Sequence, residues 1–162
     1  MSAFSANLQK KDEEAERQGK GSAAYEAGCH CGYVKFRVTL SPPFPEHQVL
    51  QCNCSACTKL GYLLIYPTAD DVVWHNNGRE RCGVYQFNTK QKDQLFCPKC
   101  GTSIGIDFRD VLKPHRYGIS ARTIYGLNLD ELNIEKANGM EKVHPAVDLS
   151  GQWWDEEKQE MK

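Results

Sequence analysis

Cys97-Pro98-Lys99-Cys100-Gly101 is the stretch of this sequence that decides the fold. Two cysteines separated by two residues in a tight turn can direct both sulfurs at one metal ion, and the glycine lets backbone N–H groups point at the thiolates. Such a zinc knuckle supplies only half of a tetrahedral site. The other half has to come from another part of the chain.

Two further cysteine groups compete to complete the knuckle, Cys29-His30-Cys31-Gly32 and Cys52-Asn53-Cys54-Ser55-Ala56-Cys57. Side chains two residues apart share one face of a regular strand, but two thiols can reach one ion only if the backbone bends between them, and Gly28 and Gly32 permit a bend around the first pair. The first pair is the natural completion, giving a closed four-thiolate site whose metal contributes folding free energy. The predicted structural zinc ligands are Cys29, Cys31, Cys97 and Cys100.

Cys52, Cys54 and Cys57 then remain as a three-thiolate group. Three protein ligands with one open position are typical of a catalytic zinc. Zn²⁺ with three thiolates carries a net charge of about −1, so it acidifies bound water less than a three-histidine site does. Exchange of sulfur ligands, or polarisation of the carbonyl in a thiol adduct, therefore suits this predicted site better than hydrolysis.

Other interpretations of the cysteines stay open at this stage. A disulfide network, a redox-active pair, one shared metal site and an iron–sulfur cluster are weaker, because the chain shows no secretory signal, no thioredoxin-like βαβ pattern and no ferredoxin spacing. Cys82 is either an ordinary thiol or the fourth ligand that closes the second site. The histidines are expected outside the metal shells; they are His30, His47, His75, His115 and His144.

Composition places the chain among ordinary soluble proteins of one domain. It has 162 residues, 40% of them hydrophobic, and a net charge of −1, so a global basic surface for nucleic acid is not expected. No apolar run is long enough to span a membrane, and the polar N-terminus lacks the apolar core of a secretory signal. We expect a cytoplasmic protein, with the nucleus as an alternative; the sequence indicates no oligomeric state.

Short alternating segments predict a mainly β fold. Val34, Phe36 and Val38 alternate with polar residues, and similar short segments recur at intervals of eight to twelve residues. We divide the chain into a polar N-terminal arm at 1–24, expected to be disordered or frayed, a zinc-binding domain at 25–135, and a C-terminal extension at 136–162. Trp153-Trp154 in the extension is expected to cover an apolar surface.

Three segments together resemble the glutathione-dependent formaldehyde-activating enzyme family, whose domain also occurs in centromere-protein-V-like proteins. They are Gly28 to Phe36, Cys52 to Gly61 and Phe96 to Thr102, and the stretch Ala121 to Leu132 is similar to that family's C-terminal part. The resemblance implies a zinc-pinned β-sheet fold, similar to the zinc-containing chaperones of guanine-nucleotide exchange. It also implies two Zn²⁺ ions, divided between the two cysteine groups as above.

The activity that the resemblance implies is condensation of glutathione with formaldehyde, so the expected function is that of a carbon–sulfur lyase or synthase. Glutathione is the expected co-substrate, and Lys59 and Arg122 are candidates to bind its carboxylates, although both can equally be surface or salt-bridge cations. Two alternatives stay open. The same zinc site can act on a specialised-metabolite intermediate, or the zinc can serve only to fold a binding module.

Overall fold

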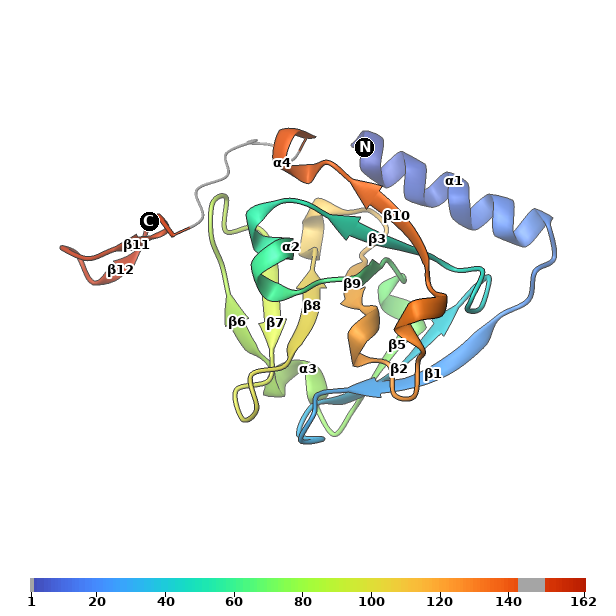
Figure 1. Ribbon diagram of the computed structural model, residues 1–162, viewed down its shortest axis with the longest axis horizontal. Helices are drawn as coiled ribbons and strands as arrows, with labels where there is room; N and C mark the ends of the chain where they lie inside the picture. The colour runs from blue at the N-terminus through green and yellow to red at the C-terminus, as the bar shows by residue number, and fades with distance from the viewer. Residues whose placement is uncertain (1, 143–150) are drawn as a thin grey trace.

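The structure, a computed structural model, describes residues 2–142 and 151–162. It is mainly β, as predicted, with a three-stranded and a seven-stranded sheet and a C-terminal hairpin (Figure 1). The three-stranded sheet has the order β1 (Ala23–Gly28), β2 (Lys35–Leu40), β5 (Val72–His75). The seven-stranded sheet has the order β10 (Asn133–Ala137), β3 (Gln48–Cys52), β4 (Leu64–Ile65), β9 (Tyr117–Ser120), β8 (Ser103–Asp107), β7 (Asp93–Phe96), β6 (Gly83–Tyr85).

Helices are short except for the first. The α-helices are α1 (Ala3–Arg17), α2 (Ser55–Leu60), α3 (Gly78–Arg81) and α4 (Gly139–Lys142). Single 3₁₀ turns are η1 (Ala69–Asp71), η2 (Arg109–Val111), η3 (Ala121–Thr123) and η4 (Leu129–Glu131).

The main core joins the two sheets. Phe36 and Val38 of β2, which the alternation predicts to be buried, are fully inaccessible, and they belong to one cluster with Val49 of β3 and Ile119 of β9. Contacts across these strands remove apolar side chains from water, which is the dominant favourable term in folding.

A second, smaller core lies against α1 and α2. It contains Leu8 of α1, Cys57 of α2 and Leu64 of β4. A register shift between β7 and β8 helps to divide the two cores, because Ile104 joins the main core while Ile106, two residues later, joins the second one. A β-bulge has this effect because it adds one residue and so changes the face to which the following side chains point.

The prediction of a disordered or frayed N-terminal arm was wrong. Residues 3–17 form α1, which lies along β10 and β3 (Figure 1). Lys11 binds Glu135 of β10 at 3.0 Å, and Asp12 pairs with the buried side chain of Arg116. Few residues of α1 are buried, among them Leu8 and Ala15, so the helix is held by a narrow apolar stripe and by ion pairs. The polar composition of α1 is therefore similar to that of a solvated arm without regular structure.

The C-terminal part adds β10 as an edge strand parallel to β3. This strand crosses residue 135, the predicted C-terminal boundary of the zinc-binding domain. Beyond it, β11 (Trp154–Asp155) and β12 (Glu160–Met161) form a hairpin. The Trp153 ring lies 5.6 Å from the Phe87 ring, whereas Trp154 is about half exposed. Within the residues that the structure describes, no helix is long and apolar enough to cross a membrane. The expected similarity to the guanine-nucleotide-exchange chaperones stays a prediction.

Leu8→Ala should lower the free energy of unfolding by about 2 kcal/mol, because Leu8 is 8% exposed and its removal leaves a cavity between α1 and the sheet. Equilibrium unfolding in urea measures this change. Leu129→Ala is the matched control, because Leu129 is 38% exposed, and it should cost less than about 0.5 kcal/mol. Equal losses in the two variants would contradict the docking of α1.

Candidate metal centres

Two turns from different sheets bring four cysteine sulfurs together. Cys29 and Cys31 lie in the turn between β1 and β2, and Cys97 and Cys100 lie in the turn between β7 and β8. All four sulfurs lie within 4.8 Å of one another. The Sγ atoms of Cys29 and Cys31 are 3.6 Å apart, and those of Cys31 and Cys97 are 3.8 Å apart.

Backbone N–H groups point at these sulfurs in both turns. Val34 N–H donates to Cys29 Sγ at 3.2 Å, and Lys99 N–H donates to Cys97 Sγ at 3.4 Å. The first turn needs glycine at position 28, because a Cβ there would meet the carbonyl oxygen of Val34 at 2.4 Å. Gly32, at φ +81°, completes the bend that the sequence predicts.

Proton affinity is unevenly distributed among the four thiols. Burial raises the pKa of Cys29, but hydrogen bonds from Val34 N–H and neighbouring thiols bring it below its ordinary value. The hydroxyl and the backbone N–H of Thr102 lower the pKa of Cys100 to about 5. For Cys31, the Tyr33 N–H lowers the pKa, while burial and the three other sulfurs raise it to about 11. A cation bound to the four sulfurs would displace the protons from those thiols that are protonated.

The second cluster lies where β3 passes into α2. Cys52 ends β3, Cys54 precedes the first turn of α2, and Cys57 lies inside that helix; their sulfurs are also within 4.8 Å of one another. The Cys57 N–H donates to Cys54 Sγ at 3.5 Å, so Cys54 caps the helix. Cys57 is 7% exposed and packs in the second core, whereas Cys52 and Cys54 are partly exposed.

The segment after β10 wraps around the beginning of this cluster. Asn53 N–H donates to the carbonyl oxygen of Ala137 at 3.1 Å, and the Asn53 side-chain amide donates to Asn138 Oδ1 at 2.9 Å. Met140 N–H returns a bond to Asn53 Oδ1 at 3.0 Å. Asn53 is therefore held on both its backbone and its side chain, which fixes the position of the two flanking cysteines.

Electrostatics in the second cluster favour one thiolate, at Cys52. Hydrogen bonds from the thiols of Cys54 and Cys57 lower the pKa of Cys52, and the backbone N–H groups of Cys54 and Gly139 add to this effect. The pKa values of Cys54 and Cys57 rise, chiefly because they share their protons with Cys52. Half-buried Lys92 lies near this cluster: burial brings its pKa below the ordinary value, and the negative charge of the cysteine cluster opposes this effect.

Both clusters fit a thiophilic metal ion. Four sulfurs bound to one zinc at about 2.3 Å are about 3.8 Å apart at the corners of a tetrahedron, close to the separations of 3.6 and 3.8 Å in the first cluster. The second cluster offers three thiols without a fourth cysteine, histidine or carboxylate among the described residues. Cysteine thiolates favour zinc or another soft ion over magnesium or calcium.

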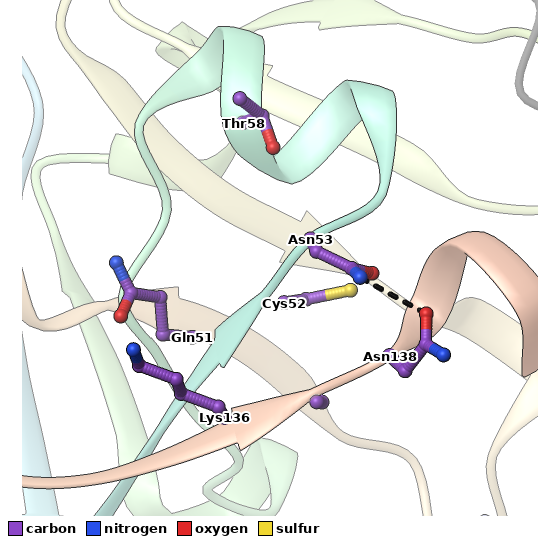
Figure 2. A pocket seen from close by; sticks show the side chains of 7 residues that line it. Gln51, Cys52, Asn53, Thr58, Lys136 and Asn138 are labelled. Carbon is purple, nitrogen blue, oxygen red and sulfur yellow. Dashed lines mark hydrogen bonds between the residues drawn. The ribbon is translucent and has the colours of Figure 1, made fainter.

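A groove of about 430 Å³ borders the second cluster. Figure 2 shows Cys52 at its centre, Gln51 beside Lys136, and Asn53 bonded to Asn138. Its walls are the end of β3 with Asn53, Thr58 of α2, the end of β10, and Asn138, which follows β10. This volume lies within the range usual for small-molecule sites.

Other predicted residues lie outside both clusters. Cys82 donates to the Gly78 carbonyl oxygen at 3.3 Å, and burial raises its pKa to about 11, so it does not join the three thiols. All eight cysteines are free thiols, so the disulfide network is not formed. The described histidines, His30, His47, His75 and His115, belong to neither cluster; His144 lies outside the described residues.

The two residues predicted to bind a substrate carboxylate lie near the end of α2. Lys59 is exposed in the last turn, and Arg122 Nε donates to the carbonyl oxygen of Gly61 at 2.9 Å, just after the helix. Neither side chain lines the groove. Their role in binding substrate stays a prediction.

Sequence reasoning missed the residues that approach the cluster from β10. The Asn138-Gly139 pair indicates a turn, whereas Asn133 to Ala137 shows no alternation of apolar and polar residues. Nothing in them indicates that β10 pairs with β3, more than 80 residues earlier in the chain. Lys92 carries no local signal either, because its Nζ lies over the ring of Phe108, a residue distant in sequence, at 5.7 Å from the ring centroid.

The fold and the two thiol clusters define a small, mainly β protein suited to binding two metal ions. A family model described as "Glutathione-dependent formaldehyde-activating enzyme" matches residues 24–130, which is well over half of the chain. The chain belongs to this family.

The chain is similar to one curated protein and to one solved structure. A Halomonas elongata protein named "Putative glutathione-dependent formaldehyde-activating enzyme" is 33% identical over 90 residues, which are 50% of this chain and 54% of that protein. The match therefore spans about half of the relative's length. A crystal structure of a Rhodobacter sphaeroides protein from a structural genomics programme superposes with a TM-score of 0.57 at 27% identity, covering 68% of this chain and 97% of that one.

Metal content should fall as the pH is lowered. The pKa values of Cys31, Cys54 and Cys57 are raised, so a metal ion must displace protons from these thiols, and acid favours the protons. Protein loaded with cobalt(II) should lose its thiolate-to-metal absorption between about pH 7 and pH 5. Cys54→Ser should show this loss for the four-cysteine cluster alone. Absorption that does not change with pH would contradict metal binding by these thiols.

Proposed function

We propose that this protein is a zinc-dependent carbon–sulfur lyase or synthase that acts on the adduct of a thiol, of glutathione type, with an aldehyde. One observation carries the proposal: a complete four-thiol cluster stands apart from a three-thiol cluster, and Cys52 of the latter lines a groove. Membership of the glutathione-dependent formaldehyde-activating enzyme family supports the same substrate class.

The two clusters have different proposed roles. Cys29, Cys31, Cys97 and Cys100 hold a structural zinc, because four protein thiolates leave no position for a substrate. Cys52, Cys54 and Cys57 hold the second zinc, at the active site. When bound there, zinc supplies a Lewis acid of low net charge that can accept a substrate thiolate or the oxygen of its adduct.

The proposed reaction balances without an oxidant or a reductant. In the forward direction a C–S bond forms between the thiol sulfur and the aldehyde carbon, and the thiol proton ends on the former carbonyl oxygen; the reverse direction breaks the same bond. The residues of this chain hold the reacting groups. Asn53 fixes the two cysteines that flank it, and the packing of Cys57 in the second core excludes water from one side of the cluster.

Several finer assignments belong to this proposal. We take residues 25–135 as the zinc-binding domain, with 1–24 and 136–162 as extensions of it. The cytoplasm, or the nucleus, is the proposed compartment, because eight free thiols suit a reducing environment. Lys59 and Arg122, near the end of α2, stay predicted to bind the carboxylates of the substrate.

A second candidate keeps the site and changes the substrate. Lys136, Ala137 and Asn138 line the groove but lie beyond the matched residues 24–130. A wall outside the family-matched segment favours a thiol adduct larger than that of formaldehyde, for instance an intermediate of specialised metabolism. Comparing turnover of adducts that share glutathione but differ in the aldehyde distinguishes the two candidates.

Cysteine substitutions should separate the two proposed zinc ions. Cys100→Ser should unfold the domain, because metal binding in the closed cluster is coupled to folding. Cys54→Ser should keep the fold and lower the zinc content from about two ions per chain to about one. Mass spectrometry of the intact protein together with circular dichroism measures both effects. Equal unfolding by the two substitutions would make both clusters structural.

Activity should follow the second cluster. Wild-type protein should speed the exchange between formaldehyde, glutathione and their adduct, observed by NMR exchange spectroscopy, and Cys54→Ser should lose at least about 100-fold of this rate. Cys82→Ser is the matched control, because Cys82 is a cysteine outside both clusters, and it should retain the rate. Full activity in Cys54→Ser would contradict the proposal.

A further inference from the structure

The groove has one wall that the matched family segment does not supply. Residues 136–138 form this wall, and the parallel pairing of β10 with β3 places Lys136 opposite Gln51 and Ala137 opposite Cys52. The bonds of Asn53 to Ala137 and Asn138 hold the wall against the second cluster. The backbone of this wall is therefore held beside Cys52 both by strand pairing and by the hydrogen bonds of Asn53.

Among the described residues that line the groove, Lys136 is the only Lys, Arg, Asp or Glu. The other polar lining groups are amides and a hydroxyl, from Gln51, Asn53, Asn138 and Thr58. Lys136 takes part in none of the ion pairs among the described residues. The neighbouring acid on β10, Glu135, is already bound to Lys11 of α1. The groove thus combines one ammonium group with uncharged amide and hydroxyl groups and with the sulfur of Cys52.

We propose that Lys136, with Gln51 beside it, is the subsite that binds a carboxylate of the thiol substrate. This inference rests on the proposed function, and it narrows the substrate class to thiols that carry a carboxylate. Figure 2 shows the side chains of Lys136 and Gln51 next to each other on adjacent strands. An ammonium group donates up to three hydrogen bonds to a carboxylate, and an amide NH₂ adds another. Cys52 lines the same groove, so the groove adjoins both the subsite and the thiol cluster.

Calorimetric titration with a matched pair of ligands tests this subsite. Glutathione and glutathione diethyl ester share the thiol, but both carboxylates are blocked in the ester. Lys136→Met in the zinc-loaded protein should weaken glutathione binding by about two- to fivefold, the range expected for an ion pair at an exposed lysine. It should leave binding of the diethyl ester unchanged. Lys10→Met, an exposed lysine on α1, is the control and should leave both affinities unchanged.

Each outcome decides between the subsite and the proposed function. Equal weakening of both ligands by Lys136→Met, or none, overturns the subsite while the thiol chemistry stands. A loss confined to Lys59→Met overturns it in favour of the end of α2. Failure of wild-type protein to bind glutathione overturns the proposed function and this inference with it. Urea unfolding of Lys136→Met, expected to match wild type, shows that a changed affinity is not a folding defect.

Discussion

The rest of the structure depends on the approach of four sulfurs from two separate sheets. Cys29 and Cys31 belong to a turn of the three-stranded sheet, and Cys97 and Cys100 to a turn of the seven-stranded sheet. A cation between them would join segments more than 60 residues apart, and closing so long a loop carries a large entropic cost in the absence of a strong bond. The main core between the sheets supplies the remaining attraction through Phe36, Val38 and their neighbours.

Much of the fold and of the candidate site could be predicted from local patterns. The spacing of the cysteines groups them as the structure does, and the alternation around Phe36 places β2 correctly. The segment 3–17 shows where local patterns fail. Its helix, α1, docks through a few apolar contacts and through ion pairs such as that of Asp12 with Arg116. Partners so distant in sequence leave no periodic signal in the polar helix itself.

The active-site proposal joins two parts of the chain with different relationships to the family. The three thiols lie inside the matched segment 24–130, whereas one wall of the adjoining groove lies outside it. Under the proposed function, chemistry and selectivity can therefore vary independently: the thiols would set what reaction is possible, and the wall would set which thiol adduct fits. Fold and metal ligands alone consequently define a reaction class and leave the substrate to residues such as Lys136.

The parallel pairing of β10 with β3 also has a consequence for the order of folding during synthesis. The ribosome releases all seven clustered cysteines, from Cys29 to Cys100, before β10 at 133–137 leaves the exit tunnel. The nascent chain therefore carries every clustered thiol outside the tunnel while the edge of β3 still lacks its parallel partner. A bare strand edge is a template for pairing with another chain, so this edge stays unprotected until residues 133–137 have been synthesised.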